Sequence, residues 1–297
     1  VLNFEMNFGG FARLVMGLIA VIMLAFASAL VKWQVTRLIR PINRLDLENP
    51  LENDVYEELT PLLQSIDKQN KEKDAVANMR KEFSANVSHE LKTPLTSISG
   101  YAEIMKNGLV KPEDMTGFAE RIYNEASRLI TLVEDIIKLS KLDEGNVELE
   151  KEEVDLYKLT REILTRLSPQ AAKRKVHVEV TGEPVEYVGI RQILDEMIYN
   201  ICENAIKYNK EGGKLTVWVG NTLQGKKICV TDTGIGIPEN ETDRIFERFY
   251  RVDKSHSKET GGTGLGLSIV KHGAMLHGAK IHVDSKLGEG TKIELIF

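Results

Sequence analysis

The chain has 297 residues, of which 42% are hydrophobic and 28% charged, so neither a disordered chain nor a wholly membrane-embedded protein is indicated. Its formal net charge of −5 gives no reason to expect nucleic-acid binding. The two cysteines, Cys202 and Cys229, lie far apart and outside any metal-ligand spacing. They cannot supply a disulfide framework, and two thiols in a reducing compartment are the simplest interpretation.

An uncharged run, LVMGLIAVIMLAFASALV, extends from Leu14 to Val31. With its apolar neighbours it reaches the length of a membrane span, and we predict a transmembrane helix over residues 11–33 in preference to a buried soluble helix or a signal peptide. More basic residues follow this run than precede it, so the positive-inside rule places the C-terminal side in the cytoplasm. We expect residues 1–10 to be the remnant of an extracytoplasmic part, because few residues precede the span and the first is valine.

Two long helices are predicted in the middle of the chain, after a polar juxtamembrane linker over residues 34–60. Between about residue 56 and residue 106 the sequence contains a single glycine, Gly100, and Gly108 and Pro112 then mark a turn. A second helical run extends to about Leu142. We expect residues 61–145 to form one helical domain.

Apolar residues recur at intervals of three and four in both runs, which is typical of a packed helical seam. In the first run they are Val87, Leu91, Leu95, Ile98, Ala102 and Met105, and in the second Met115, Ala119, Ile122, Ala126, Leu129, Val133, Ile136 and Ser140. Phe118, Leu132 and Ile137 widen the second face. One hairpin cannot enclose both faces, so we expect two chains to form a dimeric four-helix bundle.

A single histidine, His89, lies two positions from each of two seam residues and therefore on the opposite, solvent-exposed face. Glu90 adjoins it, and Thr93 follows one helical turn later on the same face. Pro94 removes a backbone donor and is expected to bend the helix locally. An exposed imidazole beside a carboxylate has what a nucleophile needs, since the carboxylate can hold one ring proton while the other nitrogen keeps its lone pair.

The C-terminal half changes to a mixed α/β pattern, with strands predicted at 147–154, 175–182, 214–221 and 226–232 and a helix from Gly189 to Lys207. Four clusters along this half are expected to line one pocket. On the predicted helix, the carboxamides of Asn200 and Asn204 lie on one face and can ligate Mg²⁺. Lys207 can neutralise phosphate charge, and the ring of Tyr208 can lie against a base. After a buried strand comes DTGIGIP, with Asp232, Gly234 and Gly236 placed to meet an exocyclic amine and a ring.

The remaining two clusters suit phosphate groups. In RIFERFYRVD, Arg248 and Arg251 offer guanidinium groups. In ETGGTGLGLSIVKH, a series of glycines precedes an apolar helix whose N-terminal N–H groups suit phosphate: Gly261, Gly262, Gly264 and Gly266. The stretch DKSHSKET is interpreted as a mobile lid, and residues 143–146 as a hinge. Each cluster taken alone is compatible with an ordinary surface or turn.

In this order the clusters closely resemble the cytoplasmic part of bacterial sensor histidine kinases, over about residues 37–297. The resemblance implies that His89 is the phospho-acceptor, Glu90 its general base, and Thr93 a residue that helps dephosphorylate the partner regulator. It implies that residues 150–297 form the ATP-binding α/β sandwich shared with gyrase-like ATPases (the GHKL or Bergerat fold). Within that domain it assigns Asn204 to Mg²⁺, Asp232 and Thr291 to the adenine site, and Arg251 to the γ-phosphate. The linker RPINRLDLENP resembles that of the phosphate-responsive-type subgroup.

The function expected from the sequence is therefore a homodimeric membrane kinase that phosphorylates His89 from Mg·ATP and passes the phosphoryl group to an aspartate of a response regulator receiver domain. An ATP hydrolase of the same fold is the main alternative, but such enzymes place a glutamate four residues before the Mg²⁺-binding asparagine, where this chain has Asn200. A dimerising scaffold without catalysis is the second alternative, and a predominant regulator phosphatase the third.

Overall fold

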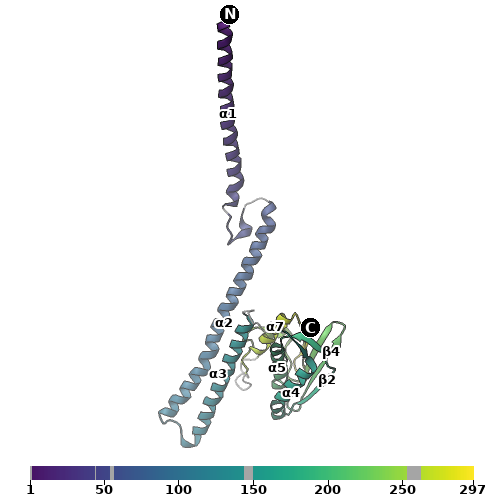
Figure 1. Cartoon of the computed structure of the whole chain (residues 1–297). Coiled ribbons are helices and arrows are strands. Elements are labelled where there is room, and N and C mark those ends of the chain that lie inside the picture. Colours follow the sequence, from purple (N-terminus) through teal and green to yellow (C-terminus); the bar gives the residue numbers. More distant parts are fainter. Residues whose placement is uncertain (1, 44, 54–56, 144–149, 253–261) are drawn as a thin grey trace. The chain divides into compact units, whose positions relative to one another are not determined.

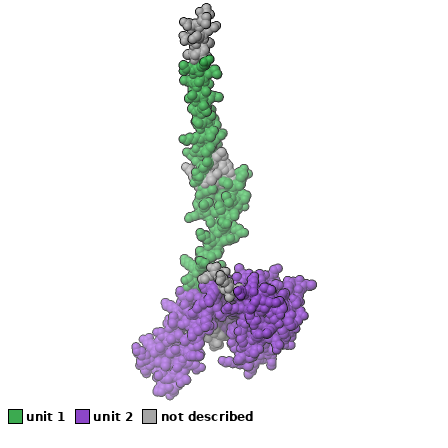
Figure 2. All heavy atoms as spheres, in the orientation of Figure 1, with its two compact units in different colours: residues 1–84 green, residues 85–297 purple. Residues whose placement is uncertain are grey.

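The computed structural model describes residues 2–43, 45–53, 57–143, 150–252 and 262–297. The predicted lid and most of the predicted hinge lie outside these residues. Contacts divide the chain into two compact units, Val1–Ser84 and Ala85–Phe297 (Figure 2). The two units are considered in turn below.

The first unit begins with a long helix, α1 (Leu2–Ile42), which contains the predicted transmembrane segment. Its stretch Arg13–Arg37 is long and apolar enough to cross a membrane, and none of it is buried. Trp33 is exposed, with the Arg37 guanidinium 5.3 Å from its ring centre. The helix runs beyond the predicted span at both ends and takes in the first part of the predicted linker.

The rest of the predicted linker contains ordered turns. Two 3₁₀ helices, η1 (Pro50–Glu52) and η2 (Glu57–Leu59), precede the next long helix. The side chain of Asn53 closes the first turn: its amide donates to the carbonyl of Asp46 at 2.8 Å, and its oxygen accepts from the N–H of the same residue at 2.8 Å. This Asx-type closure gives the segment a defined shape without a hydrophobic core.

The helical hairpin consists of α2 (Thr60–Lys106) and α3 (Met115–Asp143), joined through the 3₁₀ turn η3 (Pro112–Asp114). The connection starts at Gly108, whose φ of 68° closes the end of α2 through a bond from its N–H to the carbonyl of Met105. The rings of Tyr101 and Phe118 meet edge to face at 5.7 Å across the hairpin. The predicted hairpin is confirmed, and its helices begin and end close to the predicted positions.

The apolar faces of the hairpin are only partly covered within one chain. Leu132 and Leu139 of α3 are 4% and 0% exposed. Leu95 on α2 keeps 53% of its surface exposed, and Ile130 and Ile137 on α3 keep 61% and 50%. Large apolar side chains at these exposures form the surface that a second hairpin would cover.

The C-terminal part is an α/β sandwich, as predicted. A five-stranded sheet has the order β2-β4-β5-β7-β6, in which β2 and β4 are parallel and the other neighbours antiparallel. A separate pair is formed by β1 and β3. The helices α4, α5 and α7 lie on one face of the sheet (Figure 1). The bounds are β1 (Glu152–Asp155), α4 (Leu156–Lys173), β2 (His177–Gly182), β3 (Glu186–Gly189), α5 (Arg191–Lys207), β4 (Lys214–Thr222), β5 (Gly225–Asp232), η4 (Glu239–Glu241), η5 (Arg244–Phe246), α7 (Gly266–His277), β6 (Lys280–Lys286) and β7 (Gly290–Ile296).

The core lies between these helices and the inner face of the sheet. The alternating residues Leu215, Val217 and Val219 of β4 are fully buried there. This alternation is what a sheet covered on one face requires. The helix α4 completes the layer, and the sequence analysis did not identify it. Its N-terminus is capped by the carboxylate of Asp155, which accepts from the N–H groups of Tyr157 and Lys158 at 2.9 and 3.0 Å.

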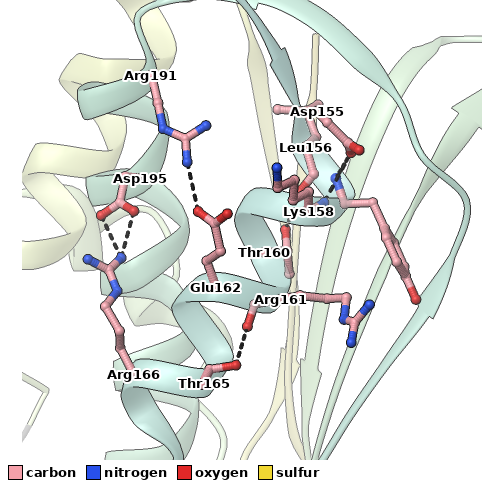
Figure 3. A network of polar contacts seen from close by, with 11 residues as sticks. Asp155, Leu156, Lys158, Thr160, Arg161, Glu162, Thr165, Arg166, Arg191 and Asp195 are labelled. Carbon is pink, nitrogen blue, oxygen red and sulfur yellow. Dashed lines mark hydrogen bonds and ion pairs between the residues drawn. The ribbon is translucent and has the colours of Figure 1, made fainter.

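Ion pairs connect α4 to α5 on the outer side of this layer (Figure 3). Arg166 donates to both carboxylate oxygens of Asp195 at 2.6 and 2.7 Å, and Arg191 pairs with Glu162 at 2.7 Å. The guanidinium of Arg166 also lies 5.6 Å from the ring centre of Tyr199. These contacts fix the register of α5 against α4, and α5 carries several of the predicted site residues.

A half-buried histidine connects α7 to the start of α5. The Nε2 of His277 accepts a hydrogen bond from the N–H of Ile190 at 3.0 Å, while Nδ1 donates to the carbonyl of Gly273 at 2.8 Å. This pattern requires the neutral imidazole. Burial lowers the pKa of His277 below its ordinary value of 6.5.

We expect the stability of the fold to fall below about pH 6.5 partly through His277. The unfolded chain binds a proton there that the folded chain resists, so the contribution is complete above the unfolded pKa and is lost as the pH falls through the folded one. In thermal unfolding of the chain between pH 8 and pH 5, His277→Gln should show a smaller drop in Tm than the parent. His282→Gln, on the exposed part of β6, should behave like the parent, and an equal drop for His277→Gln would contradict the assignment.

Candidate functional site

The first part of the site is the exposed side of α2 around His89. The imidazole of His89 is exposed and Glu90 is half-buried, as the seam on the opposite face predicts. The hydroxyl of Thr93 donates to the carbonyl of His89 at 3.2 Å, which places it one turn along the same face. The helix is uninterrupted across Pro94, which is buried. The expected bend at Pro94 stays a prediction.

The second part is a half-buried carboxylate at the end of β5. Asp232 Oδ1 accepts from the N–H of Gly234 at 2.7 Å and from the N–H of Thr291 at 3.3 Å. Thr291 is also the register partner of Asp232 on β7. Burial raises the pKa of Asp232, although both hydrogen bonds oppose the rise. With Oδ1 held by the backbone, the carboxylate has a fixed direction and a second oxygen with which to accept from a ligand.

The loop after Asp232 is tied both to the end of α5 and to the turn between β6 and β7. The N–H of Ile235 donates to the carbonyl of Tyr208 at 3.1 Å, and the carbonyl of Ile235 accepts from the N–H of Gly288 at 2.7 Å. Gly236 has a φ of 68° and passes so close to the backbone of Lys286 that a Cβ would collide with its carbonyl. The chain thus brings together Tyr208, Asp232 and Thr291, which lie far apart in the sequence.

The glycine-rich segment before α7 lies directly over α5. A Cβ on Gly266 would come within 2.6 Å of Asn200 Oδ1, and one on Gly262 would collide with the ammonium of Lys207. The carbonyl of Gly264 accepts from the N–H of Phe249 at 2.9 Å. A side chain at Gly262 or Gly266 would displace the end of the Lys207 or Asn200 side chain, whereas at Gly264 the φ of 74° and the Phe249 backbone at 2.9 Å from a Cβ require glycine.

Positive charge is concentrated where this segment meets α5. Burial, with a smaller contribution from nearby guanidinium groups and against the opposing charge of Glu203, lowers the pKa of Lys207 to about 8. Burial also lowers the pKa of Arg251, whose guanidinium donates to the carbonyl of Gly262. Buried cations with few carboxylates near them make a favourable place for an anion.

The two arginines of the RIFERFYRVD cluster have different surroundings. Arg251 lies against the glycine-rich segment, where its guanidinium donates to the carbonyl of Gly262. Arg248 instead donates to His272 Nε2 at 3.1 Å, and His272 Nδ1 donates to the carbonyl of Ser268 at 2.8 Å. Arg248 is thereby held against α7, a contact that the sequence analysis did not foresee because it joins residues 24 apart.

The predicted Mg²⁺ ligand, Asn204, lies on α5 with its side chain half-buried, one turn after Asn200. Asn200 itself donates to the carbonyl of Glu196 at 2.8 Å. No cluster of three or more His, Cys, Asp or Glu side chains able to hold a metal occurs among the described residues. A donor set this small suits Mg²⁺, which takes one or two protein oxygens and completes its shell with phosphate and water.

Polar contacts also join α3 of the hairpin to the α/β sandwich, within the second unit. The hydroxyl of Thr263 donates to Asp135 Oδ2 at 2.7 Å, and Lys138 pairs with Glu196 at 3.4 Å. Burial raises the pKa of Asp135 and of Glu196. The sequence analysis missed these four residues, because their positions in the chain differ in no way from those of ordinary surface residues.

Two family models match the chain. Residues 79–145 match the His Kinase A (phospho-acceptor) domain, and residues 189–297 match the Histidine kinase-, DNA gyrase B-, and HSP90-like ATPase. The first contains His89, and the second contains every pocket residue from Asn200 to Thr291. The chain belongs to the sensor histidine kinases.

Curated relatives carry the same name for the family. The sensor histidine kinase WalK of Bacillus subtilis is 37% identical over 235 residues, which cover 75% of this chain and 37% of that protein. A WalK of Staphylococcus aureus is 36% identical over 225 residues, which cover 75% of this chain and 54% of that protein. The chain thus spans between about a third and about half of these relatives. They belong to a different subgroup from the phosphate-responsive one, so that subgroup assignment, drawn from a short linker, is wrong.

Solved structures agree in fold. Histidine kinase ThkA in complex with the response regulator protein TrrA aligns with a TM-score of 0.60 at 26% identity, covering 77% of this chain and 64% of that one. The histidine kinase AdeS of Acinetobacter baumannii aligns with a TM-score of 0.58 at 23% identity, covering 70% of this chain and 97% of that one, and shows the fold alone.

We expect Asp232→Asn to weaken nucleotide binding about 10- to 100-fold, which corresponds to the loss of a hydrogen bond to a charged group. The introduced amide would keep an oxygen for the two backbone N–H groups but would turn a donor toward the amine of the base. Titration of a fluorescent ATP analogue measures the affinity, with Asp284→Asn on exposed β6 as the matched control. Unchanged affinity in a folded Asp232→Asn chain would remove Asp232 from the site.

Proposed function

We propose that this chain is the catalytic part of a membrane sensor kinase that phosphorylates His89 from ATP and passes the phosphoryl group to an aspartate of a response regulator. The observation that carries the proposal is the pairing of an exposed His89 beside Glu90 with a cation-rich pocket built from α5, β5 and the start of α7. In this proposal the pocket holds the phosphate donor and the hairpin holds the acceptor.

The pocket residues fit Mg·ATP by their chemistry. Asp232, oriented by Gly234 and Thr291, suits the amine of adenine. Lys207 and Arg251, with backbone N–H groups of the glycine-rich segment, suit the phosphates. Asn204, together with Asn200, would supply the protein oxygens for Mg²⁺, which when bound neutralises charge on the phosphates.

The chemistry assigned to the hairpin is nucleophilic. One ring nitrogen of His89 attacks the γ-phosphorus, the bond from that phosphorus to the bridging oxygen of ADP breaks, and Glu90 takes the proton of the other ring nitrogen. The products are phosphohistidine and ADP. The exposure of His89 serves the next step, since a receiver aspartate needs access to the same nitrogen.

The α5 helix argues against simple ATP hydrolysis. Asn200, at the position where hydrolases of this fold place their base, is an amide that donates to the carbonyl of Glu196. The two nearby glutamates are also engaged, Glu196 with Lys138 and Glu203 with the hydroxyl of Tyr199 at 3.3 Å. Water is therefore without an activating carboxylate among these residues, and ATP keeps its γ-phosphate for His89.

We expect His89→Gln to abolish labelling of the chain by γ-labelled ATP and Mg²⁺. The parent should acquire label that is stable to base and labile to acid, as a phosphorus–nitrogen bond requires. His177→Gln, at the exposed start of β2, is the matched control and should label normally. Label retained in His89→Gln would contradict the acceptor assignment, and ATP consumption without label in the parent would support the hydrolase alternative.

Regulator dephosphorylation is a second candidate activity, favoured by the position of Thr93. Its hydroxyl is exposed one turn from His89 and already bonded to the carbonyl of that residue. A hydroxyl so placed can orient water toward a phosphoaspartate docked over the histidine.

We expect Thr93→Ala to keep histidine phosphorylation within about twofold and to slow dephosphorylation of a phosphorylated receiver domain by about tenfold or more, as for loss of a group that orients water. Thr131→Ala on α3 removes the same kind of helix-backbonding hydroxyl and is the control. Equal dephosphorylation rates in both variants would remove Thr93 from this activity.

The association state and location belong to the same proposal. The open apolar side chains of the hairpin support a homodimer through a four-helix bundle, and the match to a His Kinase A domain agrees with it. The candidate span in α1 supports anchoring in the cell membrane with the catalytic part in the cytoplasm. The domain boundaries that go with this organisation are 11–33 for the span, 34–60 for the linker, 61–145 for the hairpin and 150–297 for the catalytic domain.

A further inference from the structure

A carboxylate of the hairpin meets two guanidinium groups that come from different elements. Glu90 Oε2 lies 3.8 Å from Arg251 and 3.9 Å from Arg128, in each case from the NH2 nitrogen. Arg251 belongs to the α/β sandwich, whereas Arg128 lies on α3, in the same hairpin as His89. All three side chains are largely withdrawn from water, with 31%, 13% and 23% of the side chain exposed for Glu90, Arg251 and Arg128.

Cations outnumber carboxylates among the groups that act electrostatically on Lys207 and Arg251. Arg128 acts on both and Arg174 acts on Lys207, whereas the opposing carboxylates are Glu203 for Lys207 and Glu90 for Arg251. An excess of positive charge in a partly buried place favours the arrival of an anion. Under the proposed function that anion is the triphosphate, and its arrival gives Arg251 a more highly charged partner than Glu90.

Arg128 and Arg251 are attached to different domains, so they respond differently when the nucleotide domain moves. Arg251 is fixed to the glycine-rich segment through the carbonyl of Gly262 and goes where the nucleotide domain goes. Arg128 is anchored on α3 opposite Glu90, so its distance to Glu90 depends only on the packing of the hairpin. When Arg251 turns to phosphate, Arg128 is the cation that remains on Glu90.

We propose that Arg128 is a positioning residue for histidine phosphorylation, which holds Glu90 Oε2 and so aims the other carboxylate oxygen at the ring proton of His89. The role rests on the proposed function and adds a member from α3 to its machinery. The guanidinium contacts of Arg128 and Arg251 are both at Oε2, and Oε1 is the oxygen to which the proposal assigns the proton. A carboxylate without this support would turn among rotamers, and the fraction of time in the productive one would fall.

The test separates turnover from binding in the whole chain, with γ-labelled ATP and Mg²⁺. Arg128→Gln should lower the labelling rate at saturating ATP by about tenfold, within the range for a misplaced general base, and leave KM for ATP within about twofold. Arg128→Lys should recover much of the rate, because it restores a cation without the planar fork. Arg121→Gln is the matched control: Arg121 lies one heptad earlier on α3 and packs near the rings of Tyr101 and Phe118.

Several outcomes overturn the role. A normal labelling rate for Arg128→Gln removes Arg128 from the step. A rise in KM with the saturated rate unchanged assigns Arg128 to nucleotide binding, and a loss that Arg128→Lys does not relieve at all assigns it to packing. Thermal unfolding and light scattering of each variant monitor the fold and the dimer. Failure of the proposed function is distinct, since the parent chain itself would then acquire no label.

Discussion

A carboxylate that leaves water must find hydrogen-bond donors, and the nucleotide pocket is organised by this requirement at Asp232. The donors come from the backbone of two segments, at Gly234 and Thr291, that only the finished sheet brings together. The same loop is held in place by a hydrogen bond from the N–H of Ile235 to the carbonyl of Tyr208 at the end of α5. One buried charge thus links the strand that presents it, the helix that carries the residues proposed to face phosphate, and the turn that closes the sheet.

The opposite constraint governs the hairpin, where the reactive group must stay in water while its helix buries an apolar face. The helical spacing of the apolar residues meets both requirements, because it places His89 on the face opposite the seam, where the side chain is exposed. Glu90 occupies the boundary between the two environments, half-buried and facing guanidinium groups. The division of charge is complementary: a carboxylate adjoins His89, and cations outnumber carboxylates around Lys207 and Arg251.

The sequence predicted the features that depend on local period and on motif order. The hairpin, the exposure of His89 and the convergence of Asn200, Lys207, Asp232 and the glycines all follow from spacing or from family resemblance. It did not predict α4, whose apolar face was not distinguished from the surrounding strands. It also missed Arg128, Asp135, Lys138 and His272. Their roles arise from which surfaces pack together, and a charged residue on a helix carries no local sign of its distant partner.

The open apolar side chains of the hairpin have a consequence for how the molecule responds to its own abundance. Leu95, Ile130 and Ile137 remain largely in water in a single chain. Covering them by a second hairpin makes folding and association parts of one equilibrium, so mass action enters the free energy of the hairpin. Confinement to a two-dimensional membrane would raise the local concentration of chains and favour the paired state. The expression level would then set the fraction of chains whose His89 lies in a dimeric, fully packed bundle.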